Sequence, residues 1–470
     1  MAKAIASVFP AVGGMEQSPP KQTSVDFDLI VNFDCSDNTL MPRRGWRAVR
    51  YVSTWGNETV SGTSRYVPSA YTYLGSTATR PLGAYLFSSP TGNDYIIKCR
   101  LNTSTNVSSA LVYDSTGKQV VGGTGTQLIG DGRADPIDRP YVFTVFGRVV
   151  YFTNGGSVWR WSELTNKIEN AAASFPGFAR NPLDRDQHVY FNDMYGATIV
   201  HNHLGRMIYA GFYSDDYLSA SGAIDSNNDG IVTQADLKDG QGYKVVSNKQ
   251  AVQPQPYALW ASDAYMPQCV KVSSVGSVIT LPSTNGITGL ASFNRQLVIF
   301  TENEMYVSNA TLTQLQKVTD VGCVAHRSIK STPAGMLIWL APGGIYAWNG
   351  AGLPQKMSAG LDPMFQGNAA YSLPAKMTGF NPQTLQLPYR ISGRRSNLAS
   401  AAIVRSGNYY AVSVSAGSGV EDNTVILCCS YATGKCWVYA SPSNEMGSAT
   451  SGSGGSGCYT LMDNPREPEM

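Results

Sequence analysis

Six segments of the sequence share one layout, and this weak repeat restricts the possible folds more than any other feature of the chain. In each segment a turn with Gly or Asn leads into an alternating apolar strand, a second tight turn, and a strand that carries Tyr or Trp. Short strands repeated in this way are typical of β-propellers, in which each blade is a small antiparallel sheet packed on its neighbours. The clearest copies lie at 141–161, 198–212, 290–309 and 335–350, and looser copies lie at 83–113 and 401–439.

The repeat predicts an all-β fold, a divergent β-propeller of about six blades with inserted loops. The copies are unevenly spaced, at intervals of about 40 to 90 residues, and this irregularity requires the insertions. No segment of about twelve residues or more sustains the i, i+3, i+4 apolar spacing of a helix. A pair of β-sandwiches is the competing architecture.

The composition agrees with crowded β-sheets. Charged residues make up 14% of the 470 residues, against about 25% in typical soluble domains, and the chain has 47 Gly and 26 Tyr. These values exclude a coiled coil and a charge-rich disordered chain. The 35 basic and 33 acidic residues leave a net charge of +2, which gives no general attraction to nucleic acid or to an acidic membrane.

The sequence gives no sign of membrane insertion. No stretch reaches the roughly 18 apolar residues that a membrane helix needs, and residues 4–14 are too short and too broken by Pro and Gly for a secretory leader. We therefore expect synthesis in the cytoplasm. The eight cysteines are scattered along the chain, as expected for free thiols in a reducing compartment. Cys428, Cys429 and Cys436 lie in strand-like sequence and are expected to be buried.

Three segments differ from the repeats in composition. Residues 1–50 form the expected N-terminal arm and first strand, and residues 441–470 form a Ser/Gly-rich C-terminal tail. Residues 51–440 form the expected propeller-like body. Within this body, the polar residues 213–255 are expected to form an insertion between two blades.

The insertion contains the sharpest local motif of the chain, an Asp- and Asn-rich loop at 225–236. Its residues match a calcium loop, with side-chain oxygens at positions 1, 3, 5, 9 and 12, a carbonyl at position 7 and Gly230 at the sharp turn. The predicted Ca²⁺ would make the insertion rigid and take no part in chemistry. The alternative is an Asn/Asp/Gly surface loop without metal. The predicted ligands are Asp225, Asn227, Asp229, Ile231, Thr233 and Asp236, the last in place of the usual Glu, as in dockerin-type loops.

Two clusters of arginine are candidate contact sites. The first contains Arg43, Arg44, Arg47 and Arg50, and the second lies at 390–395. Arginine side chains can hold phosphates or a carboxylate-rich protein partner, and a net charge close to zero favours contact with protein over a grip on DNA. The alternative is that these side chains are only solvated.

No catalytic motif stands out, and we expect a protein that is not an enzyme. The G-x-S-x-G, P-loop and H-E-x-x-H patterns do not occur. His201 and His203 alternate along a strand, so their rings face one side, but no third clear ligand accompanies them. We expect ordinary hydrogen-bonded histidines there. Three aspartates, Asp184, Asp186 and Asp193, could form a carboxylate pair of the kind that glycosidases use. Solvated loop side chains are the simpler explanation.

The order of several motifs resembles a known protein family. Within 289–308 the sequence follows an F-x-x-x-L-x-I-F-T-E-x-x-x-Y pattern, 321–329 contains G-x-x-x-x-x-S-I, and 335–350 contains G-I-Y. Near the N-terminus, 25–32 and 42–46 are similar to the family's opening strand and turn, although the turn here reads Pro-Arg-Arg-Gly. In this order of motifs the chain resembles the tail nozzle, or packaged-DNA-stabilising, propellers of short-tailed (podovirus-like) bacteriophages.

The resemblance implies a structural virion protein of the phage tail, made in the bacterial host cytoplasm. Such a protein forms a homo-oligomeric ring, a hexamer, below the head-to-tail adaptor protein. The ring gates and conducts genomic DNA without sequence specificity and docks tail fibre or spike proteins. Two alternatives stay open: a calcium-stabilised carbohydrate-binding or glycan-cleaving β-propeller, and another phage tail hub or fibre-docking protein.

Overall fold

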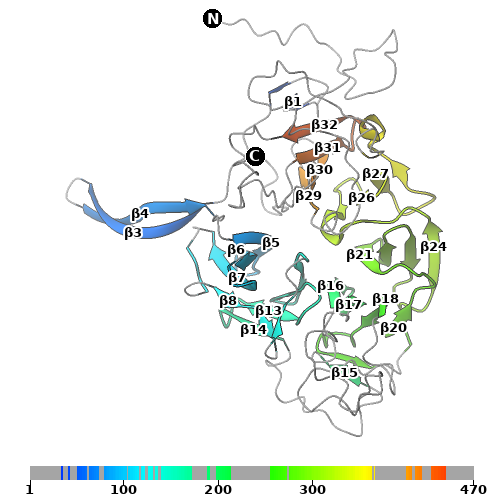
Figure 1. Ribbon diagram of the computed structural model, residues 1–470, viewed down its shortest axis with the longest axis horizontal. Coiled ribbons are helices and arrows are strands. Elements are labelled where there is room, and N and C mark those ends of the chain that lie inside the picture. The colour runs from blue at the N-terminus through cyan, green and yellow to red at the C-terminus, as the bar shows by residue number, and fades with distance from the viewer. Residues whose placement is uncertain are drawn as a thin grey trace, which may run out of the picture.

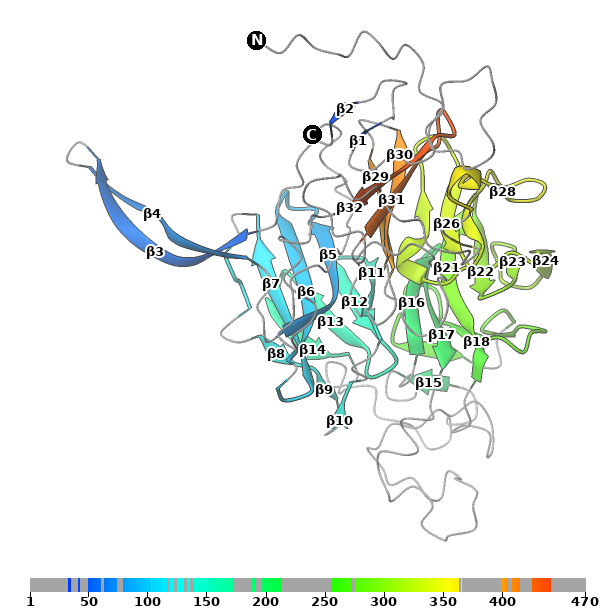
Figure 2. The ribbon, with the colours of Figure 1, turned by 45° about the horizontal axis from the view of Figure 1, so that its top comes forward.

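The chain folds into a ring of six antiparallel sheets (Figures 1 and 2). Each sheet has four strands, hydrogen-bonded side by side in chain order. The first strand of each sheet lies toward the axis of the ring and the fourth lies at the rim. This arrangement is a six-bladed β-propeller, which confirms the predicted fold and excludes the pair of β-sandwiches. The computed structural model describes residues 33–34, 41–42, 50–171, 188–190, 197–212, 255–365 and 399–440, apart from short internal gaps of which 415–424 is the longest.

The six repeats of the sequence correspond to the six blades, one repeat to each blade. Blades 1 to 3 comprise β5 (Thr79–Ser88), β6 (Asp94–Asn102), β7 (Val107–Asp114) and β8 (Thr126–Gln127); β11 (Val142–Phe146), β12 (Val149–Thr153), β13 (Trp159–Ser162) and β14 (Lys167–Asn170); and β16 (Ala197–His203), β17 (Arg206–Phe212), β18 (Gln255–Ala261) and β20 (Val278–Thr280). Blades 4 to 6 comprise β21 (Ile287–Phe293), β22 (Gln296–Thr301), β23 (Met305–Ser308) and β24 (Leu315–Thr319); β25 (Lys330–Ser331), β26 (Leu337–Ala341), β27 (Gly344–Trp348) and β28 (Gln355–Lys356); and β29 (Ser400–Val404), β30 (Tyr409–Val414), β31 (Val425–Ser430) and β32 (Cys436–Ala440).

Smaller elements lie between and beside the blades. Two short 3-10 helices, η5 (His326–Ser328) and η6 (Ala359–Leu361), lie on either side of blade 5 in the sequence. The short strand β1 (Phe33–Asp34) contacts β32 of the last blade. The remaining short strands pair as three ribbons: β1 (Phe33–Asp34) with β2 (Met41–Pro42), β9 (Ile129–Gly130) with β10 (Arg133–Ala134), and β15 (His188–Tyr190) with β19 (Cys269–Lys271).

A long two-stranded arm precedes the first blade and projects away from the ring (Figures 1 and 2). It consists of β3 (Arg50–Val60) and β4 (Thr63–Tyr73), each of 11 residues. The pairing register shifts near Thr54, and such bulges bend a β-ribbon. The expected body at 51–440 therefore divides into this arm and, from Thr79 to Ala440, the six blades.

Tight turns join the strands within the blades. Leu204 and Gly205, between β16 and β17, both have positive φ angles of 49° and 79°, and Asn294 and Arg295, between β21 and β22, have φ angles of 49° and 63°. Two central residues with positive φ characterise the two-residue hairpin turn whose twist matches that of paired strands. The strands on either side can therefore alternate inward and outward without a break.

Among the described residues, the core consists of five hydrophobic clusters, and each cluster joins consecutive blades. Blades 1 and 2 share the cluster around Trp161, blades 2 and 3 the cluster around Trp260, and blades 3 and 4 the cluster around Ile299. Blades 4 and 5 meet around Trp339, and blades 5 and 6 around Tyr410. Because these clusters bury the apolar faces of consecutive blades, the packing is continuous from blade 1 to blade 6.

Polar contacts also connect consecutive blades. The Tyr141 amide donates to the Leu82 carbonyl at 2.8 Å, which joins blade 2 to blade 1. The Thr153 hydroxyl donates to the Ala197 carbonyl at 2.8 Å, between blades 2 and 3. On blade 6, the hydroxyl of Tyr410 donates to the carbonyl of Ser328 at 2.7 Å, at the entrance to blade 5. These bonds fix the rotation of blade 2 against blades 1 and 3, and of blade 6 against blade 5.

The six described cysteines are buried, which confirms the prediction for Cys428, Cys429 and Cys436. Where the structure describes the chain, no helix has the length and apolar character required to cross a membrane.

Candidate functional site

Most residues singled out in the sequence lie outside the described part of the chain. These are the calcium loop at 225–236, the cluster at 390–395, and Arg43, Arg44, Arg47, Asp184, Asp186 and Asp193. Arg50 is the first residue of β3. The calcium site and the arginine contacts therefore stay predictions, and the candidate site is formed by other residues.

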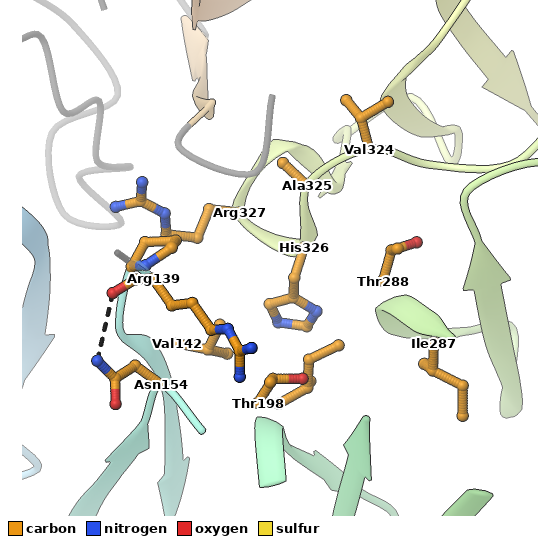
Figure 3. Close-up of a pocket in the computed structure, with 12 residues that line it drawn as sticks. Arg139, Val142, Asn154, Thr198, Ile287, Thr288, Val324, Ala325, His326 and Arg327 are labelled. Atoms are coloured by element: carbon orange, nitrogen blue, oxygen red, sulfur yellow. Dashed lines mark hydrogen bonds between the residues drawn. The ribbon is translucent and has the colours of Figure 1, made fainter. Parts of the chain in front are cut away.

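A cavity of about 170 Å³ lies among the innermost strands, near the axis of the ring (Figure 3). Blades 2, 3 and 4 and the segment that enters blade 5 contribute to its wall. Arg139, His326 and Arg327 give this wall its cationic and imidazole groups, and none of its described residues is Asp or Glu. The described wall of the cavity is therefore largely apolar, with two arginines and one histidine among its residues.

His326 of η5 projects into this cavity (Figure 3). The Leu290 backbone N–H donates to Nδ1 of His326 at 3.1 Å. Burial, together with the charges of neighbouring His201, Lys330 and Arg327, lowers the pKa of His326 to about 3. The ring is therefore neutral at pH 7. Since its Nδ1 accepts a hydrogen bond, its proton is on Nε2.

Two further histidines hold one serine beside the cavity. Nε2 of His201 and Nδ1 of His203, both on β16, each lie 2.8 Å from Oγ of Ser292 on β21. The ring of His201 also meets that of His326 edge to face, with centroids 6.1 Å apart. These contacts confirm the prediction of hydrogen-bonded strand histidines and join blade 3 to blade 4.

Their acid–base properties suit this structural role. Burial and the adjacent His203 lower the pKa of His201 to about 4. Burial and the charge of Arg206 lower the pKa of His203 to about 4. A general base works best with a pKa near the operating pH, so both rings are weak bases toward Ser292 at neutral pH.

A buried carboxyl group, Asp135, lies where blade 2 begins. It accepts hydrogen bonds from the Tyr141 hydroxyl at 2.8 Å, the indole Nε1 of Trp159 at 2.7 Å and the Ser157 amide at 3.0 Å. Burial raises the pKa of Asp135 to about 7, although the three hydrogen bonds oppose this shift. The group therefore fixes the chain at the entrance to blade 2, close to where Arg139 enters the cavity.

Sequence reasoning missed Asp135, Arg139, His326 and Arg327. All four lie in the segments that lead into an innermost strand, β11 or β25. His326 and Arg327 fall within 321–329, which the sequence marked only as part of the family resemblance. Alignment of the six repeats on their first strands would have identified these entry segments as the ones that face the axis.

The described residues offer little for metal chemistry. Among them, no group of three or more His, Cys, Asp or Glu side chains is arranged to hold a metal ion.

Comparison with solved structures finds proteins of remote similarity. No protein-family model matches the chain, and no curated protein matches it in sequence. A chain of the mitotic checkpoint complex is similar at 9% identity and a TM-score of 0.37, over 76% of this chain and 79% of that one. The Dos1 propeller is similar at 11% identity and a TM-score of 0.35, over 66% of each chain. The extracellular domain of BT4673 from B. thetaiotaomicron is similar at 9% identity and a TM-score of 0.31, over 60% of this chain but only 34% of that one.

Gly156 is required to accommodate the buried carboxyl group. A Cβ atom at position 156 would lie 2.1 Å from Oδ1 of Asp135, so Gly156→Ala must displace the carboxyl group or the backbone. We expect a loss of about 1–3 kcal/mol in the free energy of unfolding, measured with urea. The control is Gly343→Ala, whose Cβ would meet only the Tyr346 hydroxyl at 3.9 Å. Equal stability of the two variants would contradict this packing.

Asp135 predicts a pH-dependent stability. Its pKa of about 7 in the fold exceeds the usual 3.8, so the folded protein keeps a proton that the unfolded chain releases. The stabilisation is complete below about pH 4 and is lost as the pH rises through about 7. Asp135→Asn cannot titrate. We therefore compare the melting temperatures of the unaltered protein and of Asp135→Asn. The difference, unaltered minus variant, should decrease as the pH rises from about 4 to about 7. A difference that is constant or grows with pH would contradict the shifted pKa.

Proposed function

We propose that this chain is a structural protein of a short-tailed bacteriophage virion, the tail nozzle, and is not an enzyme. Six copies would form a ring below the head-to-tail adaptor protein. The ring would gate and conduct genomic DNA without sequence specificity and dock tail fibre or spike proteins. The motif resemblance suggested this function, and the β3–β4 arm is the structural observation that supports it best.

The arm has the properties of an assembly element. Its 11-residue strands are about twice the usual length, and an isolated two-stranded hairpin is at best marginally stable in water. Among the described strands, neither β3 nor β4 pairs with a third. Unpaired strand edges are templates for pairing with another chain. An arm that reaches from each subunit to the next would form the head-to-tail contact that closes a ring.

The charge of the chain fits a DNA conduit. Each phosphate contact adds salt-dependent affinity, so a wall that must let a polyanion slide cannot carry many exposed cations. The net charge of +2 on 470 residues gives the chain as a whole no general attraction to DNA.

The low pKa values of His201 and His203 support a non-enzymatic role. Two imidazoles, those of His201 and His203, contact the hydroxyl of Ser292. In an enzyme with a nucleophilic serine, one of these rings would act as the general base. With pKa values of about 4, both rings are poorly matched to that task. The group is better explained as a connection between two blades.

We also propose that the loop at 225–236 binds Ca²⁺. Adding Ca²⁺ to chelator-treated protein should raise the melting temperature, and at a hundredfold excess over Kd the added stability is about 2.7 kcal/mol. Asp225→Ala combined with Asp229→Ala should abolish this rise. Ser226→Ala, at a loop position without a ligand role, is the matched control and should keep it. If Ca²⁺ has no effect on the unaltered protein, the loop is only a turn.

The arm provides a direct test of ring formation. Replacing residues 50–73 by a short Gly/Ser linker leaves every blade intact, so circular dichroism and melting should still show a folded propeller. Mass photometry should find the unaltered protein near six times the 50.5 kDa of one chain and the armless variant near a single chain. Assembly that persists without the arm would contradict its role, and a monomeric unaltered protein would contradict the nozzle.

A further inference from the structure

Two cysteines lie opposite each other on the last two strands of blade 6. In the register of β31 and β32, Cys429 is the partner of Cys436. The next pair toward the turn is hydrogen-bonded, since the Ser430 amide donates to the Lys435 carbonyl at 2.8 Å. Hydrogen-bonded and non-hydrogen-bonded pairs alternate in an antiparallel ladder, so the cysteines form a non-hydrogen-bonded pair with Cα atoms about 4.5 Å apart. This separation falls within the range of roughly 4.4–6.8 Å that a disulfide bridges.

The two thiols also contact each other. Their side chains lie on the same face of the sheet, in the hydrophobic cluster around Tyr410 that blades 5 and 6 share. The thiols of Cys429 and Cys436 share a hydrogen bond. Sγ of Cys436 also donates to the carbonyl of Met357 at 3.4 Å. The fold therefore already brings the two sulfur atoms together.

The adjacent Cys428 provides an internal comparison. Successive side chains of a strand point to opposite faces, so Cys428 is directed away from Cys436. Cys428 lies opposite Trp437 and outside the cluster that contains Cys429. Both Cys428 and Cys429 are fully buried, so burial does not distinguish them. Of these two residues, Cys429 alone shares a face with Cys436.

An exposed turn lies beside the pair and gives it a route to solvent. The turn joins β31 to β32, and Ala432, Thr433 and Gly434 within it are exposed. Among the described strands, β32 is hydrogen-bonded to β31 alone. An edge strand beside an exposed turn opens locally at a smaller cost in free energy than a central strand. Cys436, the first residue of β32, is therefore the thiol that a reagent reaches first.

We propose that Cys429 and Cys436 form a disulfide when the protein meets an oxidising small-molecule disulfide such as oxidised glutathione. The Cys436 thiolate attacks one sulfur of the reagent, whose S–S bond breaks and releases one glutathione thiolate. The Cys429 thiolate then attacks the sulfur of Cys436 in this mixed disulfide, and a second glutathione thiolate leaves. The protein loses two protons and two electrons, and the two glutathione molecules take them up as thiols.

The redox state of the pair then depends on its surroundings. In a reducing compartment both thiols persist, and in an oxidising one the disulfide forms. Burial and the hydrogen bond with Cys436 raise the pKa of the Cys429 thiol well above its usual range, so oxidation is slow at neutral pH. The disulfide ties β32, the fourth strand of the last blade, to β31. Both cysteines belong to one chain, so the inference does not rest on the proposed function or on ring assembly.

Peptide mapping of the full-length protein tests this proposal. The folded protein is treated with oxidised glutathione at mildly alkaline pH, alkylated, and digested with trypsin without reduction. Trypsin cleaves after Lys435, so Cys429 and Cys436 fall in different peptides, which the disulfide joins. Mass spectrometry should find the joined peptides after oxidation and lose them after treatment with dithiothreitol. Cys429→Ala and Cys436→Ala should each abolish the joined peptides.

Two matched controls assign the link to these sulfur atoms. Cys428→Ala and Cys458→Ala each remove the other cysteine of one of the two peptides, and both variants should keep the link. Oxidation should also raise the melting temperature of the unaltered protein and of Cys428→Ala, because the cross-link restricts the unfolded chain. The melting temperature of Cys436→Ala should not rise.

Two results would overturn the proposal. One is the absence of joined peptides from the oxidised, unaltered protein. The other is a link that persists in Cys429→Ala or disappears in Cys428→Ala, because a different cysteine would then form it. If Cys429→Ala fails to fold, Cys429→Ser keeps the size of the side chain and takes its place, and its circular dichroism spectrum verifies the fold. A link that persists in Cys429→Ser would likewise reject the proposed pair.

Discussion

Blades that follow one another in the chain cover each other's apolar faces, and the rest of the structure depends on this mutual burial. Strands of 2 to 10 residues within the blades form sheets too small to bury both faces alone. Four indoles, on blades 2, 3, 5 and 6, are almost fully buried, and each belongs to a sheet that packs on another sheet; they are Trp161, Trp260, Trp339 and Trp437. Hydrophobic burial of this kind has no preferred direction, so hydrogen bonds such as that from Tyr410 to Ser328 fix the angle between blades.

The ring brings polar groups together at its axis that are distant in sequence. His201 and Ser292 are 91 residues apart, yet they share a hydrogen bond because β16 and β21 are the innermost strands of adjacent blades. Arg139 and Arg327 approach the axial cavity for the same reason. The site is thus a product of blade order, and a change in blade packing would move its donors apart.

The sequence was sufficient to predict the blades but not the site. Alternation and tight turns are local properties, so each repeat indicated one sheet, and six repeats indicated six blades. The axial residues could not be found in this way, because His326 and Arg139 gain their surroundings only when blades 2 to 5 meet. The sequence also does not separate the arm from the propeller body, for a related reason. The sequence of β3 and β4 has the pattern of any two paired strands. Only the lack of a third described strand in their sheet distinguishes the arm from a blade.

A rigid propeller with a projecting ribbon is a suitable building block for a closed ring. The blades supply a stiff wall, and the ribbon supplies backbone edges through which one subunit can join the next. Electron cryomicroscopy of the purified protein tests this account most directly. It predicts a sixfold ring in which the β3–β4 arm of each subunit lies against the neighbouring subunit. Particles of single propellers, or a ring whose arms contact no neighbour, would contradict it.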